Sequence, residues 1–283
     1  MAGASMKDIK LRIKSVESTM QITKAMQLVA TSKLRRAKER MENSKPYTRI
    51  AQQAVAAAVA SCEDVTIPFV TPREVRRRCY VVIAGDRGLA GGYNANIFKG
   101  VTAHAQGYDY CVLPMGRKAV ERFQRYGVES LSNDFTRVEG TTVGSCYKLA
   151  EMLIEGYKAE RYDEIWLVYT SFLSMMSQEV CIHQLLPVPK PEPEETDKVP
   201  VDTVYELSAA ETLEKIMPDF LAGRLYSALC DSFASEVSAR RTAMDSATKN
   251  AGEMIADLTL KYNRARQGAI TQEITEIVAG AEQ

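Results

Sequence analysis

The stretch MKDIKLRIKSVESTMQITKAMQLVATSKLRRAKERM, residues 6–41, decides the fold class of this chain. Its apolar and small residues recur at alternating steps of four and three, which is typical of a helix that packs along a second helix. The positions on this repeat are Ile9, Ile13, Val16, Met20, Thr23, Gln27, Ala30, Leu34, Ala37 and Met41, followed after a polar interval by Ala51, Val55 and Ala58. The first sixty residues therefore predict one long helix. Pro46 is expected to bend this helix or to split it at Tyr47.

A second long helix is predicted at the other end of the chain. Residues 208–280 contain one proline, Pro218, and heptad-like apolar spacing at Met244, Ala247, Ala251, Met254, Leu258 and Ala265. About 60 residues of helix would span roughly 90 Å, far more than a small globular domain needs. Because both terminal helices show a 3.5-residue repeat, we expect them to form an antiparallel pair with the middle of the chain inserted between them.

The middle of the chain has a different pattern. After the prolines of IPFVTPRE, residues 67–74, the apolar runs CYVVIA, YCVLPM, EIWLVYT and EVCIHQLL alternate with the helical stretches RKAVERFQRYG and VGSCYKLAEMLIEGYKAERY. This alternation predicts a mainly parallel sheet with helices packed on it, whereas PVPKPEPEETDKVP, residues 187–200, predicts an exposed loop. The fold class is α/β, an antiparallel coiled coil of two long terminal helices with an inserted Rossmann-like α/β domain. The expected divisions are 1–66, 67–206 and 207–283.

Overall charge favours no charged partner, because Lys plus Arg and Asp plus Glu both total 36. No stretch approaches the roughly 18 consecutive apolar residues of a membrane span, and the start MAGASMKDIK lacks the apolar core of a secretory signal. A cytoplasmic location is expected.

The cysteines and histidines predict neither a metal site nor a catalytic triad. The six cysteines, Cys62, Cys79, Cys111, Cys146, Cys181 and Cys230, contain no CxxC pair, and four of them have apolar neighbours. We expect them to be small core residues of a reducing compartment. His104 and His183 lie far apart in sequence, without a GxSxG or HExxH context, and are expected to be surface or structural residues.

Three segments carry a family resemblance. QITKAMQLVATSK, residues 21–33, and RQGAITQEITEIVAGA, residues 266–281, resemble the two terminal signature segments of F-type ATP synthase gamma subunits. GDRGLAGGYNANIF, residues 85–98, resembles the glycine-rich turn after the first strand of that family's central domain. The resemblance covers nearly the whole chain, in the right order. The cysteine pair of chloroplast members is not visible as a local pair in this sequence, which favours a bacterial over a plastid origin.

The resemblance implies a mechanical function without catalysis. The chain would be the central rotor shaft that couples ion flow through a membrane ring to conformational cycling of the catalytic subunits, for ATP synthesis or hydrolysis. The implied partners are the catalytic alpha and beta subunits, an epsilon subunit and the membrane-embedded c-ring, with one copy of the chain per complex. It would be a peripheral membrane protein at the cytoplasmic face of the cell inner membrane, with no cofactor.

The resemblance also implies contact residues for the catalytic subunits. The residues that it places near the moving lever segments of the catalytic subunits are Lys24, Met26, Lys33 and Arg36. The residues that it places in polar contacts with the hexamer of alpha and beta subunits are Arg240, Gln267, Thr271 and Glu273. The apolar residues Ile270, Ile274, Ile277 and Val278 would sit in an apolar bearing.

Local charge supports a partner for the first helix. Residues 1–50 carry twelve Lys or Arg against four Asp or Glu, a net of +8, which would attract acidic loops. The other explanation for this charge is a solvated basic face. Nucleic-acid binding is disfavoured, because aromatic residues are nearly absent among these charges and no known DNA- or RNA-recognition motif follows.

Two alternatives stay open. A nucleotide-binding α/β enzyme is suggested by a strand leading into GDRGLAGG, but the glycines do not give GxGxxG and no GxxxxGK[ST] occurs. We therefore expect Asp86 and Arg87 to orient this loop. A coiled-coil scaffold without a rotary role shares the helices, yet it does not predict the terminal motifs or a single α/β insertion.

Overall fold

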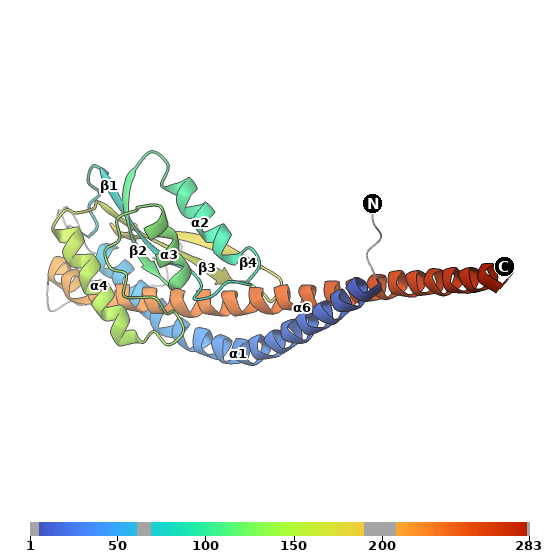
Figure 1. Cartoon of the computed structure of the whole chain (residues 1–283). Coiled ribbons are helices and arrows are strands. Elements are labelled where there is room, and N and C mark those ends of the chain that lie inside the picture. Colours follow the sequence, from blue (N-terminus) through green and yellow to red (C-terminus); the bar gives the residue numbers. More distant parts are fainter. Residues whose placement is uncertain (1–5, 61–68, 190–207, 282–283) are drawn as a thin grey trace. The chain divides into compact units, whose positions relative to one another are not determined.

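The computed structural model describes residues 6–60, 69–189 and 208–281 (Figure 1). Its elements are α1 (Met6–Ala60), β1 (Arg77–Ile83), α2 (Tyr93–His104), β2 (Asp109–Met115), α3 (Arg117–Arg125), α4 (Val143–Lys158), β3 (Glu164–Phe172), β4 (Gln178–Leu186) and α6 (Ala209–Ala281). The chain separates into two compact units. One unit contains residues 32–239, with the sheet, and the other pairs residues 1–31 with 240–283.

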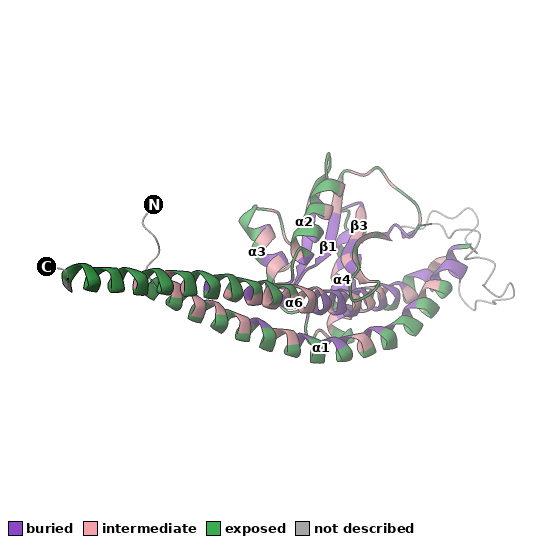
Figure 2. Ribbon diagram, turned by 90° about the vertical axis from the view of Figure 1, so that its right-hand side faces the viewer, coloured by how far each residue is buried: buried purple, intermediate pink, exposed green. Residues whose placement is uncertain are grey.

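The long helices are confirmed at both ends of the chain. α1 runs through Pro46 without a break, so of the two outcomes expected at Pro46, a bend or a split at Tyr47, the split does not occur. Pro46 is exposed, whereas Ser44 and Thr48 on the opposite side of the helix are buried, and the packing of that side holds the helix across the proline. Figure 2 shows α1 curving along this part of the chain.

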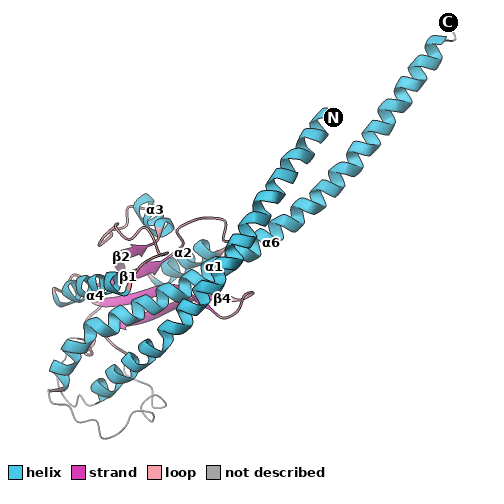
Figure 3. Ribbon diagram, turned by 90° about the horizontal axis from the view of Figure 1, so that it is seen from below, coloured by secondary structure: helices cyan, strands magenta, loops and turns pink. Residues whose placement is uncertain are grey.

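The sheet has the order β2-β1-β3-β4. β1 pairs in parallel with both β2 and β3, and β4 is an antiparallel edge strand, so the sheet is mainly parallel as predicted (Figure 3). All four predicted strands are present. Two crossovers, one through α2 and one through α3 and α4, connect the three parallel strands, as parallel pairing requires.

Helices cover both faces of the sheet. Alternate residues of β1 point to opposite faces, so Cys79 and Val81 pack in a core with α4 and the inner parts of α1 and α6, whereas Tyr80 and Val82 pack against α2 and α3. The expected burial of the cysteines is confirmed for Cys79, Cys111, Cys146 and Cys230; Cys181 is only partly buried, and Cys62 lies outside the described residues.

The unit formed by the outer parts of α1 and α6 is an antiparallel helix pair. Every predicted repeat position of α1 from Ile9 to Ala30 is buried or half-buried. Two polar contacts set the register of the pair: Thr23 Oγ1 lies 2.8 Å from Thr248 Oγ1, and Gln27 Nε2 donates to Asp245 Oδ1 at 2.9 Å. Polar side chains in such a seam specify alignment, because a slipped register would leave them unpaired.

One predicted seam residue of α6 is wrong. Met254 is 45% exposed, and the neighbouring Ile255 turns toward the seam instead, whereas the predicted Ala251 and Leu258 are buried. The buried or half-buried positions Ala251, Ile255 and Leu258 keep steps of four and three, whereas Met254 falls one residue before the repeat.

Side chains of α6 fasten the end of β3 within the larger unit. Asp231 accepts a hydrogen bond from the Phe172 N–H at 2.7 Å and another from the Ser171 hydroxyl at 3.1 Å. Ser235 donates to the Thr170 carbonyl at 3.1 Å, and both serine and threonine here are buried. We call these contacts of Asp231 and Ser235 with residues 170–172 the β3–α6 joint. The joint ties the sheet to a long helix through backbone groups as well as apolar packing.

α1 is fastened to the segment between α3 and α4. The guanidinium of Arg40 donates to the Thr141 carbonyl and, at 2.9 Å, to the Tyr226 hydroxyl of α6. Lys33 Nζ lies 2.6 Å from the Glu139 carboxylate. The inserted domain is therefore held by both long helices inside this unit.

The exposure predicted for the loop 187–200 is wrong at its start, although residues 187–189 do form a loop. Pro187 and Val188 are buried, and Val188 donates its N–H to the Phe69 carbonyl at 2.7 Å. Val188 continues the core beside Leu186, so the chain leaves the interior later than its prolines suggest. Residues 190–200, and the expected borders at 66/67 and 206/207, lie outside the described residues.

Removing the carboxylate of the joint should loosen the sheet. Asp231→Ala would leave the Phe172 N–H without its acceptor, and an unsatisfied buried donor costs about 1–3 kcal/mol. Trp166, the single tryptophan, lies in β3 and reports unfolding of the sheet by its fluorescence in urea.

The matched control is Asp257→Ala, which removes an exposed α6 carboxylate paired with Lys261. Exposed ion pairs at i, i+4 on a helix contribute about 0.3–0.5 kcal/mol to the free energy of unfolding. Equal losses of unfolding free energy in the two variants would contradict a structural role for the joint.

Candidate functional site

The glycine-rich turn after β1 is closed by residues of this chain. The Gly85 N–H donates to Asn94 Oδ1 at 2.8 Å. A Cβ at Gly85 would lie 2.6 Å from Glu236 Oε1, so a glycine is needed where the α6 carboxylate approaches the backbone. Glu236 is 4% exposed. Burial, together with the negative charge of Glu236, raises the pKa of the nearby Tyr93 hydroxyl.

Asp86 orients the loop as expected. Its two carboxylate oxygens accept hydrogen bonds from the backbone N–H groups of Val138, at 2.8 Å, and Glu139, at 3.2 Å. Arg87 takes part through its backbone carbonyl, which accepts a 3.4 Å hydrogen bond from Asn94. The turn therefore organises the segment that also contacts Lys33 of α1.

These contacts argue against nucleotide binding at the turn. A phosphate site after a strand needs free backbone N–H groups and positive potential. Here the Gly85 N–H already donates to a side chain, and the carboxylates of Asp86 and Glu236 place negative charge at the turn.

The segment 21–33 combines an inward seam with an outward apolar surface. Thr23, Gln27 and Ala30 face the helix pair, whereas the side chains of Ile22, Leu28 and Val29 are exposed by 58%, 65% and 58%. Three large apolar side chains exposed on one short helical stretch are typical of a surface that meets another protein. None of these three residues is among the predicted contact residues, although each is a large apolar residue off the seam repeat.

The structure places the eight predicted contact residues in two different units. On the outer part of α1, Lys24 is exposed and Met26 is half-buried. On the outer part of α6, Arg240 is half-buried, and the exposed residues are Gln267, Thr271 and Glu273. Lys33 and Arg36 belong to the larger unit, where Arg36 is exposed and Lys33 is already paired with Glu139. Lys33 thus has a structural role besides the predicted contact.

The last turns of α6 are exposed on all sides. α1 begins at Met6. Because Thr23 of α1 lies beside Thr248 of the antiparallel α6, Met6 lies opposite residues near Ala265. Ile270, Ile274, Ile277 and Val278 are exposed by 47%, 57%, 70% and 53%. This apolar stripe is predicted correctly as a helical face. Exposed apolar stripes of this kind are typical of surfaces that meet another protein.

In the parts of the chain that the structure describes, no cluster of three or more His, Cys, Asp or Glu side chains could hold a metal ion. None of the helices within 6–60, 69–189 and 208–281 has a segment long and apolar enough to cross a bilayer.

Comparison with known proteins identifies the family. The family model described as ATP synthase matches residues 5–283. An ATP synthase gamma chain of Ruminococcus albus is 46% identical over 279 residues, covering 97% of this chain and 96% of the relative. One from Alkaliphilus metalliredigens is 41% identical over 290 residues, covering 99% of each.

The fold is also found in solved structures. A chain in the cryo-EM structure of the Euglena gracilis mitochondrial ATP synthase (OSCP/F1/c-ring, rotational state 3) has a TM-score of 0.71 at 18% identity, covering 98% of this chain and 93% of that one. Because the sequence matches span nearly the full length at well over 30% identity, this chain belongs to the ATP synthase gamma chain family.

Proposed function

We propose that this chain is the central rotor shaft of an F-type ATP synthase, a non-catalytic subunit that couples rotation to the catalytic cycle. The single observation that carries the proposal is the nearly full-length similarity to bacterial ATP synthase gamma chains. The closed glycine turn agrees with it, because the place where an α/β enzyme would bind a phosphate is filled by Asn94 and Glu236.

The structure has the mechanical properties that such a role needs. A shaft must resist twisting, and a helix pair with an interdigitated seam does so because each helix prevents its partner from unwinding independently. Thr23 with Thr248, and Gln27 with Asp245, additionally prevent sliding along the seam. In the larger unit the β3–α6 joint and Arg40 connect the inserted domain to both helices. Torque applied to that domain would reach the helices through these contacts.

The surface of the outer helix pair supports contacts with the catalytic subunits. Lys24 and Met26 lie in the same stretch as the exposed Ile22, Leu28 and Val29, so a partner could combine acidic loops with apolar contacts there. Gln267, Thr271 and Glu273 lie beside the exposed stripe of Ile270 and its neighbours. We assign this end of α6 to an apolar bearing formed by the alpha and beta subunits.

The remaining partners follow from the same assignment. The inserted domain would bind an epsilon subunit, and the lower part of the shaft would join the c-ring, with one copy of the chain per complex. The complex would hold it as a peripheral protein at the cytoplasmic face of the cell inner membrane.

Reconstitution tests the proposal. Alpha and beta subunits of a related bacterial enzyme, mixed with this chain, should form a complex with one copy of the chain and hydrolyse ATP faster than without it. Size-exclusion chromatography with mass determination and a coupled ATPase assay measure both. Absence of a complex, together with nucleotide binding or hydrolysis by the chain alone, would refute the rotor assignment.

Charge reversal on the shaft should impair coupling selectively. Lys24→Glu places a like charge opposite acidic loops, which costs several kcal/mol across an interface, so we expect at least a roughly tenfold loss of the ATPase stimulation. Lys148→Glu, an equal charge change at an exposed position of α4, should leave stimulation nearly unchanged. Both positions are exposed, so neither variant should unfold the chain. Similar losses in the two variants would remove Lys24 from the contact set.

A further inference from the structure

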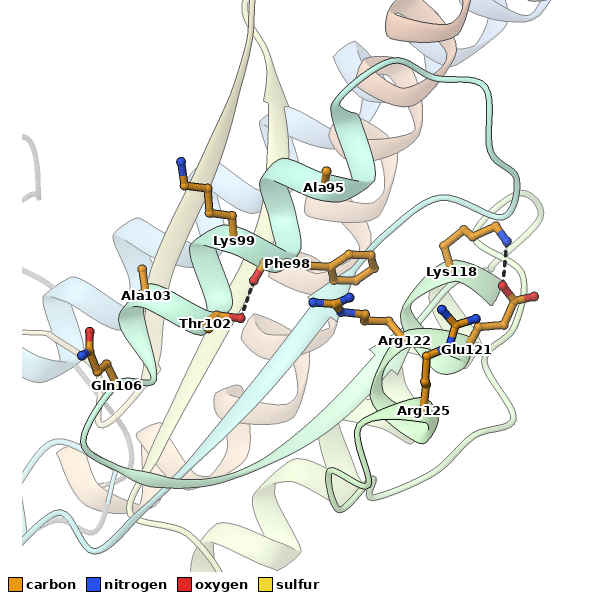
Figure 4. Close-up of a pocket in the computed structure, with 10 residues that line it drawn as sticks. All are labelled: Ala95, Phe98, Lys99, Thr102, Ala103, Gln106, Lys118, Glu121, Arg122 and Arg125. Carbon is orange, nitrogen blue, oxygen red and sulfur yellow. Dashed lines mark hydrogen bonds and ion pairs between the residues drawn. The ribbon is translucent and has the colours of Figure 1, made fainter.

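A groove of about 970 Å³ lies between α2 and α3 on the sheet face opposite the long helices (Figure 4). Its α2 wall includes Ala95, Phe98 and Thr102, and its α3 wall includes Lys118, Arg122 and Arg125. On each helix these residues are spaced by three, four or seven positions, so each wall is one helical face. The groove is therefore a trough between two helices of the inserted domain.

The charge of the trough is strongly biased. Lys99, Lys118, Arg122 and Arg125 line it together with one acidic residue, Glu121. Lys118 Nζ lies 2.6 Å from the Glu121 carboxylate, so this acid is neutralised within the trough. Three cations remain: Arg122 and the exposed Arg125 on α3, and the exposed Lys99 on α2, whose side chain is directed away from α3 (Figure 4). Such a surface attracts negative charge.

The arginine at the centre of the trough is held in place. Arg122 donates from Nη1 to the Tyr126 hydroxyl at 2.8 Å, and its guanidinium lies 4.0 Å from the Tyr126 ring centroid and 5.6 Å from that of Phe98. Phe98 in turn packs edge-on against Phe123 of the core. A guanidinium restrained in this way loses little conformational entropy when it binds a carboxylate.

The dimensions of the trough indicate the class of ligand. Its α2 wall extends from Ala95 to Ala103, about 12 Å at 1.5 Å per residue, and Gln106 lines the groove just beyond the end of the helix. A single phosphate or carboxylate group would contact only a small part of that length. A partner helix of two to three turns matches it, and small residues such as Ala95 and Ala103 leave room for a helix to approach.

We propose that the α2–α3 groove binds an amphipathic helix of a partner protein whose facing side carries Glu or Asp residues. Its carboxylates pair with Lys99, Arg122 and Arg125, and its apolar residues pack on Phe98 and the alanines. This surface lies on the inserted domain, so the inference stands independently of the contacts proposed for the helix pair.

A model helix tests the groove directly. The probe is a fluorescent helical peptide of about 20 residues, long enough to remain helical, with Glu at i, i+4 spacing on one face and Leu beside it. The comparison peptide has Lys in place of every Glu. Fluorescence anisotropy with the full chain should show saturable binding of the Glu peptide at least about tenfold tighter than binding of the Lys peptide.

Three variants separate the groove from general attraction. Lys99→Glu with Arg125→Glu should weaken binding of the Glu peptide at least about tenfold. Thr102→Trp fills the trough without changing charge and should weaken it similarly. The control, Lys148→Glu with Arg161→Glu, makes the same charge change at exposed positions outside the groove and should bind normally. Circular dichroism confirms that each variant is folded.

Other outcomes would overturn the proposal. Loss of binding in the charge variant but not in Thr102→Trp would mean diffuse electrostatic attraction. A Kd weaker than about 1 mM for the Glu peptide would mean that the trough binds no such helix. Concentration-dependent dimers that Arg125→Glu abolishes would assign the groove to a second copy of this chain.

Discussion

The structure of the larger unit depends on the attachment of the sheet to α6. The end of β3 gives its backbone N–H and C=O groups to Asp231 and Ser235, two buried or half-buried side chains of a helix that also forms the core under the sheet. Burial of the Asp231 carboxyl raises its pKa, so its hydrogen bonds with Phe172 and Ser171 offset a real desolvation cost. The sheet and the helix are therefore one mechanical body, which is what a torque-bearing insertion requires.

Burial and exposure divide along α6 in a way that fits this role. Its inner part is buried against the sheet and α1, whereas residues 271–280 are exposed on every side (Figure 2). The outer pair keeps its alignment through small polar contacts such as Gln27 with Asp245, and leaves Leu28 and Val29 outside. The shaft thus has an internal seam that fixes register and an apolar surface that remains available to partners.

Much of this fold could be predicted from local pattern. The 3.5-residue repeat from Ile9 to Met41 identified the α1 seam, because periodicity reports directly which face is buried. The effect of Pro46 could not be predicted from the sequence, since it depends on packing of the opposite face. The β3–α6 joint could not be predicted either. Asp231 and Ser235 are ordinary polar residues of a helix in the sequence, and only the folded structure brings β3 against them. The closure of the glycine turn by Glu236 has the same cause, because 150 residues separate that carboxylate from the turn.

Rotation of the inserted domain is the most direct test of the central claim. A gold particle attached through Lys148→Cys, on exposed α4, would report the motion of this domain in a complex fixed to a surface by its catalytic subunits. During ATP hydrolysis we predict continuous rotation in one direction. ATP hydrolysis at full rate while the particle shows only random fluctuation would contradict the account.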